Sequence, residues 1–297
     1  MNKDAGSPTP PTPSTRRTTA LTAAAMLAFA ANSILCRLAL QRRGIDPASF
    51  SSIRLVSGAV VLALAVRLGP SASMATPRRD WLAAVALFAY VVFFSFAYLD
   101  LSAGTGALIL FGAVQLTMLS AGLRAGERFG VLPWIGLLLA AGGLVYLVSS
   151  GITTPSPPGA ASMAIAGLAW GIYSLRGRGI ADPLAATSRN FTRAAPLALI
   201  LSLGLASTAH ADGAGIALAV ASGALTSGIG YVLWYAALRG LPALSASIVQ
   251  LSVPLIAAFG GVLFLSEALT WHLVVAAAAI LGGIALALTR RAASQRP

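Results

Sequence analysis

The sequence predicts an all-α integral membrane protein with ten transmembrane helices, arranged as two inverted repeats of five helices each. The composition is the first observation: 57% of the 297 residues are hydrophobic and 9% are charged, whereas about 25% of a soluble domain is charged. The second is a series of apolar stretches that approach or exceed the length needed to cross about 30 Å of hydrocarbon. The third is a similarity between the two halves at an offset of 140 residues. A soluble fold of this size cannot bury so much apolar surface, so a bilayer is expected to cover part of it.

The apolar stretches divide the chain into two repeats that follow a polar tail. Residues 1–18 are rich in Pro, Ser and Thr and are expected to be a disordered cytoplasmic tail, because they cannot form a core. The first repeat is expected at 19–149 and the second at 160–291, with a linker at 150–159 and a cytoplasmic tail at 292–297. The expected spans are 19–36, 50–68, 81–100, 103–123, 131–149, 160–175, 192–209, 214–238, 241–265 and 271–289.

The distribution of basic residues predicts how the chain is oriented. An even number of spans puts both termini on one side, and cytoplasmic loops carry an excess of Lys and Arg. With cytoplasmic termini, 16 of the 20 basic residues fall inside and only Arg37, Arg42, Arg43 and Arg54 fall outside. We therefore expect a multi-pass protein of a bacterial-type inner membrane. The net charge of +12 is spread over short loops, so the expected partner is the lipid bilayer and not a nucleic acid.

The internal repeat points to a transporter. Segment 97–129 aligns without gaps to 237–269, which pairs Glu127 with Glu267, and the same offset pairs two Gly-Gly sequences at 142–143 and 282–283. Asp-Pro sequences at 46–47 and 182–183 open corresponding helices. Because each repeat has an odd number of helices, the second enters the membrane with opposite polarity. Inverted repeats of this kind alternate access to a site near the midplane.

The chain also resembles a known family. The resemblance lies in Gly126-Glu127 and Ser266-Glu267 at the ends of the repeat cores, Ile53-Arg54-Leu55 in the second span, and the sequence AWGIY at 169–173. These features resemble the drug/metabolite transporter superfamily of the EamA-domain type, over nearly the whole chain after residue 18. The resemblance implies ten helices, cytoplasmic termini, export of amino acids or other metabolites, and a cavity lined by helices one, three, four, six, eight and nine. Within that group the aromatic enrichment resembles YddG-like amino-acid exporters. The first span departs from the family pattern, because Ala30-Ala31 precede Asn32 where Trp-Gly is usual.

Polar and aromatic residues inside the spans are the candidates for substrate binding, because lipid-facing positions favour neither. The offset of 140 maps Phe94 onto Trp234, which places aromatic clusters at one depth in two related helices. The candidate substrate-binding residues are Asn32, Phe94, Tyr98, Gln115, Trp170, Tyr173, Tyr231, Trp234, Gln250 and Ser252. The alternatives are an interfacial aromatic belt and polar contacts that only hold helices together. Pro254 is a candidate hinge, or a plain kink, because proline removes a backbone hydrogen bond.

The placement of charges favours export without proton coupling. No Asp, Glu or His is expected at the midplane, where proton-coupled pumps usually keep one. Arg54 is expected to extend toward the membrane interface, with attraction of a carboxylate at the outer mouth as the alternative. Since Arg37 and Arg54 are both expected near the outer face, a neutral or zwitterionic substrate fits best. Glu127 and Glu267 are expected to cap or tether helix ends.

Other protein classes find less support. Cys36, His210 and His272 are too scattered to predict a catalytic or metal site, and no nucleophile, zinc or nucleotide-binding motif is present. We expect no enzyme activity, no cofactor and no metal. A channel usually shows a filter loop or a charged ring, and neither is found. Within the transporter class the expected substrate is an aromatic or other neutral amino acid. The alternatives are a drug or sugar-type transporter and a membrane scaffold, and the Gly-Gly pairs leave open a monomer or a homodimer.

Overall fold

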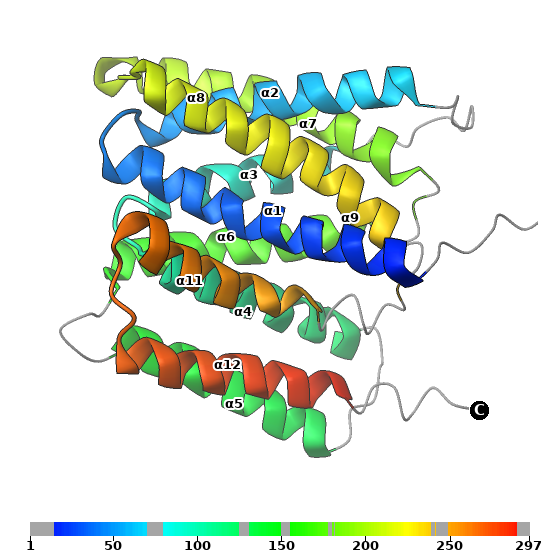
Figure 1. The fold of residues 1–297 in the computed structure, drawn as a ribbon, viewed down its shortest axis with the longest axis vertical. Coiled ribbons are helices and arrows are strands. Elements are labelled where there is room, and N and C mark those ends of the chain that lie inside the picture. Colours follow the sequence, from blue (N-terminus) through cyan, green and yellow to red (C-terminus); the bar gives the residue numbers. More distant parts are fainter. Residues whose placement is uncertain are drawn as a thin grey trace, which may run out of the picture.

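The computed structural model of the chain describes residues 15–69, 80–124, 131–149, 155–177, 180, 182–238, 241 and 249–289, and within these ranges it is helical with no strand. Figure 1 shows long helices that run roughly side by side. The first half contains α1 (Thr15–Gln41), α2 (Pro47–Leu68), α3 (Trp81–Ala97), α4 (Ala103–Arg124) and α5 (Val131–Ser149). The second half contains α6 (Pro157–Arg176), α7 (Pro183–Gly204), η1 (Ala206–Thr208), α8 (Gly213–Ala221), η2 (Ser222–Ile229), α9 (Gly230–Leu238), α11 (Ser252–Leu265) and α12 (Trp271–Thr289).

Short polar side chains fix where several helices begin. Asp46, Asp80, Ser156, Asp182 and Asp212 each accept a hydrogen bond from a backbone N–H in the first turn of the helix that follows. Such caps satisfy donors that have no partner within the helix. At three of these starts a proline occupies the first turn, where its missing N–H costs nothing.

The helices have the length and composition of a membrane protein. Within the described ranges, four stretches are long and apolar enough to span a bilayer, namely Thr15–Gln41, Pro47–Leu68, Ala103–Gly122 and Gly213–Ala237. Shorter apolar helices accompany them, and large hydrophobic side chains such as Leu138 (69% exposed) and Phe259 (71% exposed) face outward. An outward apolar surface of this kind requires lipid around it. The chain is therefore a multi-pass α-helical membrane protein.

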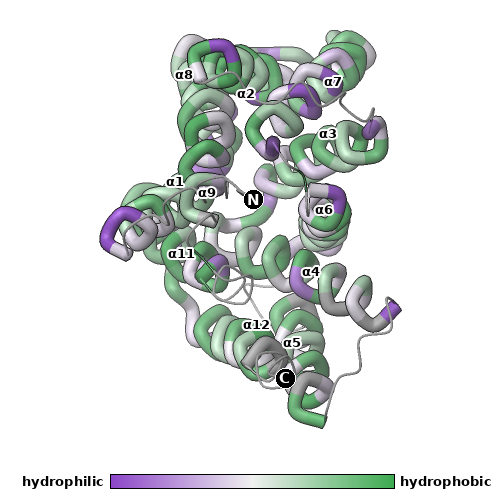
Figure 2. Tube along the Cα trace, turned by 90° about the vertical axis from the view of Figure 1, so that its right-hand side faces the viewer, coloured by the Kyte–Doolittle hydropathy of each residue, from purple (hydrophilic) through white to green (hydrophobic). Residues whose placement is uncertain are grey.

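The two halves pack around each other with an internal symmetry. The first helix of each half packs along the third span of the other half, so α1 contacts α8, η2 and α9 while α6 contacts α3. Likewise α2 packs against α7, α4 against α11, and α5 against α12. Figure 2 looks down the helices and shows α5 and α12 as a pair at one edge. This exchange of equivalent partners is the arrangement expected of two inverted repeats.

Several expected boundaries differ from those in the structure, three of them at helix starts. The helix expected from residue 19 begins at Thr15, inside the stretch expected to be a disordered tail, and α6 begins at Pro157, inside the expected linker. The seventh span begins at Pro183 and not at 192, because Asp182 caps it. Arg189 and Arg193 were expected among the cytoplasmic basic residues. Their side chains line a hollow between helices, so they can lie within α7 without facing hydrocarbon.

The Gly-Gly pairs have one inward and one outward member each. A Cβ on Gly143 would lie 2.9 Å from the Cβ of Ala279, and a Cβ on Gly283 would lie 2.6 Å from the backbone N of Ala140. These two glycines therefore allow α5 and α12 to approach closely within one chain. Gly142 and Gly282 have nothing within 4 Å of such a Cβ, and a homodimer remains a prediction.

Candidate substrate pocket

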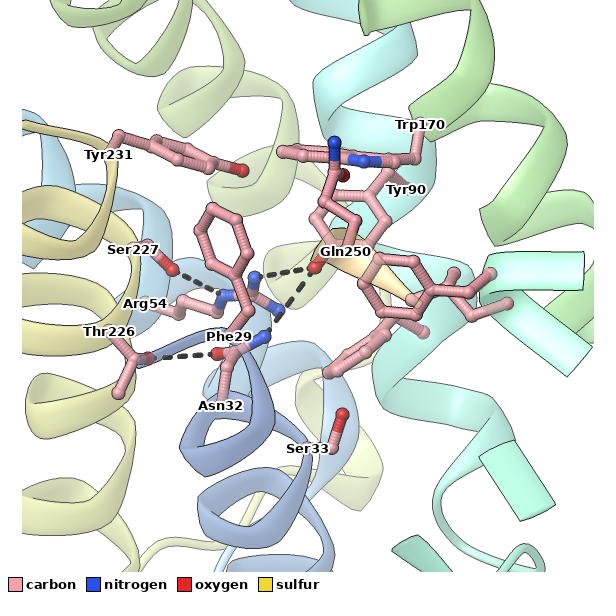
Figure 3. Close-up of a pocket in the computed structure, with 13 residues that line it drawn as sticks. Phe29, Asn32, Ser33, Arg54, Tyr90, Trp170, Thr226, Ser227, Tyr231 and Gln250 are labelled. Carbon is pink, nitrogen blue, oxygen red and sulfur yellow. Dashed lines mark hydrogen bonds between the residues drawn. The ribbon is translucent and has the colours of Figure 1, made fainter. Parts of the chain in front are cut away.

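A small central pocket lies where the two halves meet (Figure 3). Its volume is about 30 Å³, which holds a water molecule but no metabolite. A ligand can therefore enter only if the helices move apart. The lining residues are Phe29, Asn32, Ser33, Arg54, Tyr90, Phe94, Leu110, Phe111, Trp170, Thr226, Ser227, Tyr231 and Gln250.

Asn32 links the two halves at the pocket. Its Oδ1 accepts hydrogen bonds from the hydroxyls of Ser222 (2.7 Å) and Thr226 (3.1 Å), which belong to the second half. Its Nδ2 donates to the hydroxyl of Tyr90 at 3.5 Å. The side chain is 5% exposed, so these bonds are made away from water, where a lost partner is costly.

A π-helical segment supplies the second half's polar groups. The span that contains α8 and α9 widens into the π-helix η2 over Ser222–Ile229, and its Thr226 and Ser227 line the pocket. Wider turns of this kind occur often at functional sites. Gly223 permits the close packing of η2 on α2, because a Cβ there would collide with Ser57 and with the backbone carbonyl of Arg54.

Arg54 lies in the pocket and not at the membrane interface. Its side chain is buried (1% exposed), so the expectation that it extends toward the interface was wrong. Nε donates to the hydroxyl of Ser227 (3.2 Å) and Nη2 to the hydroxyl of Tyr90 (3.0 Å). The guanidinium carbon also lies 5.2 Å and 5.0 Å from the ring centroids of Tyr90 and Phe94. Because α3 and η2 enclose this face of α2 with aromatic and hydroxyl groups, the charge is held inside.

Stacked aromatic rings separate the central pocket from a second hollow. Trp170 stacks on Tyr231 with ring centroids 5.4 Å apart, and it also contacts Tyr90 (4.8 Å) and Tyr173 (5.4 Å). Tyr231 in turn contacts Tyr235 at 6.5 Å. Tyr173 and Tyr235 line the second hollow, so these rings form the wall between the two spaces.

The second hollow, which we call the vestibule, is larger and basic. Its volume is about 400 Å³, a size typical of small-molecule sites. It lies where α6 ends and α3 and α7 begin, which is the end of the bundle where α1 begins and α12 ends (Figure 1). Arg176, Arg189 and Arg193 line it together with Asp80. Burial tends to raise the pKa of Asp80, but the hydrogen bond from Arg176 (2.8 Å) and that from a backbone N–H outweigh it and hold the pKa below its ordinary value.

The far end, opposite the vestibule, is closed by a buried ion pair. Arg37, at the end of α1, donates from Nη1 to the carbonyls of Tyr98 and Leu99, both at 2.9 Å, and its Nε lies 3.5 Å from Glu267. The carboxylate of Glu267 also accepts from the backbone N of Ala103 (2.9 Å), the first residue of α4. Burial raises the pKa of Glu267, and the bonds from Ala103 and Arg37 offset this only in part. The structure confirms that Glu267 tethers helix ends, whereas Glu127 lies outside the described residues.

The structure brings half of the predicted site residues to the central pocket. Asn32, Phe94, Trp170, Tyr231 and Gln250 line it, and Tyr173 lines the vestibule. The other four, Tyr98, Gln115, Trp234 and Ser252, line neither hollow as described, except that Tyr98 and Trp234 pack against lining residues.

Tyr98 is buried at the far end, where its hydroxyl donates to the carbonyl of Ala103 (3.3 Å). Gln115 is buried in α4, outside both hollows. Trp234 packs with its edge toward Phe29, one layer behind the pocket. Ser252 bonds the carbonyl of Val249 (2.7 Å).

Pro254 lies in the first turn of α11, three residues after a break at Leu251. Proline has no N–H to bond the carbonyl of residue 250, and its ring crowds that carbonyl, so a helix break just before it is expected. The break leaves Gln250 beside the pocket. Whether this break acts as a hinge stays a prediction.

Several pocket residues were missed by sequence reasoning. Phe29, Tyr90, Thr226 and Ser227 each look like ordinary components of an apolar span. The spacing of Tyr90, one helical turn from Phe94 on the same face, left a pocket position and an interfacial belt equally open. No local sequence pattern predicts the π-helix η2. No cluster of three metal-ligating side chains occurs within the described ranges, and the absence of a cofactor stays a prediction.

Comparison with known proteins assigns the family. A model of the EamA-like transporter family matches residues 17–149 and again residues 157–289. The chain belongs to the EamA-like transporter family. It is also 52% identical over 277 residues to an uncharacterized protein of Pseudomonas aeruginosa, covering 93% of this chain and 96% of that protein. A solved crystal structure of a protein with 21% identity superposes with a TM-score of 0.66, over 96% of this chain and all of the other, and shows the shared fold.

Proposed function

We propose that this chain exports small organic metabolites, chiefly aromatic or other neutral amino acids, across a bacterial-type inner membrane by alternating access. The observation that carries the proposal is the position of the central pocket. It lies between the two inverted halves, beneath the closed far end, and is separated from the vestibule by a wall of aromatic rings. Membership of a transporter family supports the same conclusion.

The pocket chemistry supports an amino-acid substrate. Aromatic rings provide apolar contact area, and the amide and hydroxyl groups of Asn32, Thr226 and Gln250 provide hydrogen-bonding atoms. No Asp, Glu or His is among the lining residues that the structure describes, which supports transport without proton coupling. We propose transport without any enzymatic reaction.

The orientation follows from the charges. If both termini are cytoplasmic, as the distribution of basic residues predicts, the vestibule opens to the cytoplasm and the Arg37–Glu267 pair closes the outer side. The direction of export then corresponds to loading from the vestibule and release after the outer pair separates.

Counterflow in liposomes tests the proposal. Purified protein is reconstituted in liposomes preloaded with an unlabelled amino acid, and entry of labelled amino acids is measured. Trp170→Ala removes a ring that contacts three others, and we expect it to slow entry about tenfold, equivalent to about 1.4 kcal/mol of binding. Trp134→Ala is the matched control, since Trp134 is 45% exposed on α5, and it should leave entry unchanged.

Three other outcomes would each change the proposal. Entry of sugars or xenobiotics in place of amino acids would show that the substrate belongs to another chemical class. Entry that requires a proton gradient would contradict uncoupled export. Absence of any flux, with intact folded protein, would favour a scaffold.

A further inference from the structure

Arg54 is a buried charge that has no counter-ion among the residues that the structure describes. It lies within α2, 1% exposed, and the ion pairs found among the described residues join Arg37 to Glu267 and Arg176 to Asp80. The described acidic residues all lie at or beyond helix ends: Asp46, Asp80, Asp100, Asp182, Asp212 and Glu267. Burying an unpaired charge is among the most costly arrangements in a protein, and more so within a membrane.

The guanidinium group is only partly satisfied. It has five N–H donors in a fixed planar fork. Nε and Nη2 each donate to one neutral hydroxyl, on Ser227 and Tyr90, whereas Nη1 is buried and has no hydrogen-bond partner in the described part of the chain. Figure 3 shows the group between Ser227 and Tyr90, among the side chains that line the pocket. Arg54, with its incompletely bonded guanidinium, is therefore one of the residues that line the space where a ligand would bind.

From this geometry we propose that Arg54 binds the carboxylate of the transported molecule, so that the central pocket selects organic monocarboxylates such as amino acids. This inference rests on the proposed function, since it takes the central pocket to be the substrate site. A carboxylate matches the guanidinium fork with two parallel charge-assisted hydrogen bonds. It would supply both the missing partner of Nη1 and the missing negative charge. Arg54, which the sequence predicted near the outer face, thus becomes a direct charged contact for the substrate in the central pocket.

Arg54 is held in place by its neighbours, which supports a role in binding a carboxylate. The rings of Tyr90 and Phe94 hold the guanidinium by cation–π contact at 5.2 Å and 5.0 Å. The hydroxyl of Tyr90 is itself fixed by Asn32. A donor group that is held in place before binding loses little entropy when the ligand arrives.

The charge of the vestibule independently supports a substrate that carries an anionic group. Three arginines and one aspartate line it, so its net charge is positive. A hollow lined by one sign of charge concentrates ligands of the other sign. A substrate with a carboxylate would be drawn toward the wall of rings that separates the vestibule from Arg54.

A single carboxylate fits better than a phosphate. Among the described residues that line the central pocket, Arg54 is the one cationic side chain, and there is no lysine or second arginine. Phosphate groups carry more charge and are usually bound by several basic residues or by helix N-termini.

Matched pairs of substrates test the inference. Counterflow is measured for aromatic and aliphatic amino acids and for their carboxamides, which keep the side chain and the amine but lack the carboxylate. For the native protein we expect entry of each acid to exceed that of its amide by about a hundredfold, because an unpaired buried partner strongly disfavours the analogue. Arg54→Gln should lower entry of the acid to the level of the amide and leave the amide unchanged. Arg67→Gln, an exposed arginine in the last turn of the same helix, should preserve the native ratio.

The outcomes separate this inference from the proposed function. Acid and amide entering equally well in the native protein, or a preference for the acid that survives Arg54→Gln, would overturn the role of Arg54 while leaving amino-acid transport intact. If Arg54→Gln does not fold, Arg54→Lys and Ser227→Ala take its place. Both keep the charge and disturb the fork, so the ratio of acid to amide should fall in each, and an unchanged ratio would overturn the inference.

If neither acids nor amides enter, the amino-acid proposal fails. The role of Arg54 is then tested by the binding of small carboxylates to the solubilised protein. The thermal unfolding temperature of the detergent-solubilised protein is then measured with benzoate, benzamide, acetate, acetamide and inorganic phosphate. Stabilisation by a carboxylate but not by its amide, lost in the Arg54 variant, would support the inference. Equal effects of acid and amide, a stronger effect of phosphate, or no effect of any anion would overturn it.

Discussion

The two ends of the helix bundle are held by different interactions. At the far end, the Arg37–Glu267 pair is mostly buried, with side chains 16% and 12% exposed, and it bonds the backbone of three further residues. At the vestibule end, the Arg176–Asp80 pair is more exposed, at 48% and 24%, and it borders a hollow of about 400 Å³. The difference indicates which end is closed firmly in this conformation. Passage to the far side requires the buried network to break.

The largest effect is expected from breaking the far-end network with Glu267→Ala. The change leaves Arg37 without its counter-ion and the backbone N–H of Ala103 without its acceptor, which costs the closed far end about 2–3 kcal/mol. Cys36, the sole cysteine of the chain, is fully buried next to Arg37 and serves as a native reporter. Its labelling by a membrane-impermeant maleimide should rise about tenfold or more.

The control for that change is another carboxylate at the same end. Asp100 accepts a hydrogen bond from Ser156 in an exposed position, so Asp100→Asn should leave the labelling of Cys36 unchanged. Equal labelling in both variants would show that the Arg37–Glu267 pair does not close the far end.

A smaller effect is expected where Asp46 fastens the loop between α1 and α2 at the far end. Its carboxylate accepts from the backbone N–H groups of Ala48, Ser49 and His210, and Asp46→Ala should lower the free energy of unfolding by about 1–2 kcal/mol. Asp46→Asn, which keeps an acceptor for the cap, should lower it less. Thermal unfolding in detergent at neutral pH measures both.

The same residue predicts a pH dependence. Burial tends to raise the pKa of Asp46, but the hydrogen bonds from Ser49, His210 and Ala48 outweigh it and lower the pKa below its ordinary value. An acid with a lowered pKa in the folded state contributes stability that is present above its ordinary pKa of about 3.9 and lost as the pH falls through the lowered pKa. The stability gap between the native protein and Asp46→Ala should therefore close in acid, below about pH 4, and a gap that stays constant there would contradict the assignment.

The smallest effect is expected at the vestibule end. Arg176→Gln removes an exposed ion pair with Asp80, and exposed pairs contribute little because water and salt screen them. The unfolding temperature should stay close to the native value, in contrast to Glu267→Ala. A loss as large as that of Glu267→Ala would mean that the two ends are held equally firmly.

Equivalent positions in the two repeats also differ in chemistry. Counted from the Asp-Pro sequences that open α2 and α7, Arg54 corresponds to Asn190, and both side chains are buried. Arg54 lines the central pocket and Asn190 lines the vestibule. Equivalent positions in the repeats thus carry different chemistry in different hollows. The two halves share a fold, and among the described residues the buried arginine belongs to the first half alone.

The sequence by itself determined the class of fold, the repeat and many helix starts. Apolar composition dictates a bilayer as solvent, and Asp46 and Asp182 begin their helices through local hydrogen bonds that need no other part of the chain. Aromatic residues such as Trp170 and Tyr231 were recognisable because lipid-facing positions rarely need them in mid-span.

Only the tertiary structure decided which side of each helix faces the pocket. In a soluble helix the apolar face marks the interior, but in a bilayer both faces are apolar, so the period of the sequence does not distinguish lipid from protein. Arg54 was therefore expected at the interface, although Tyr90 and Ser227, from α3 and η2, enclose it. Trp234 was expected in the pocket for the same reason and lies one layer behind it, because the widened turns of η2 set the rotation of the residues that follow.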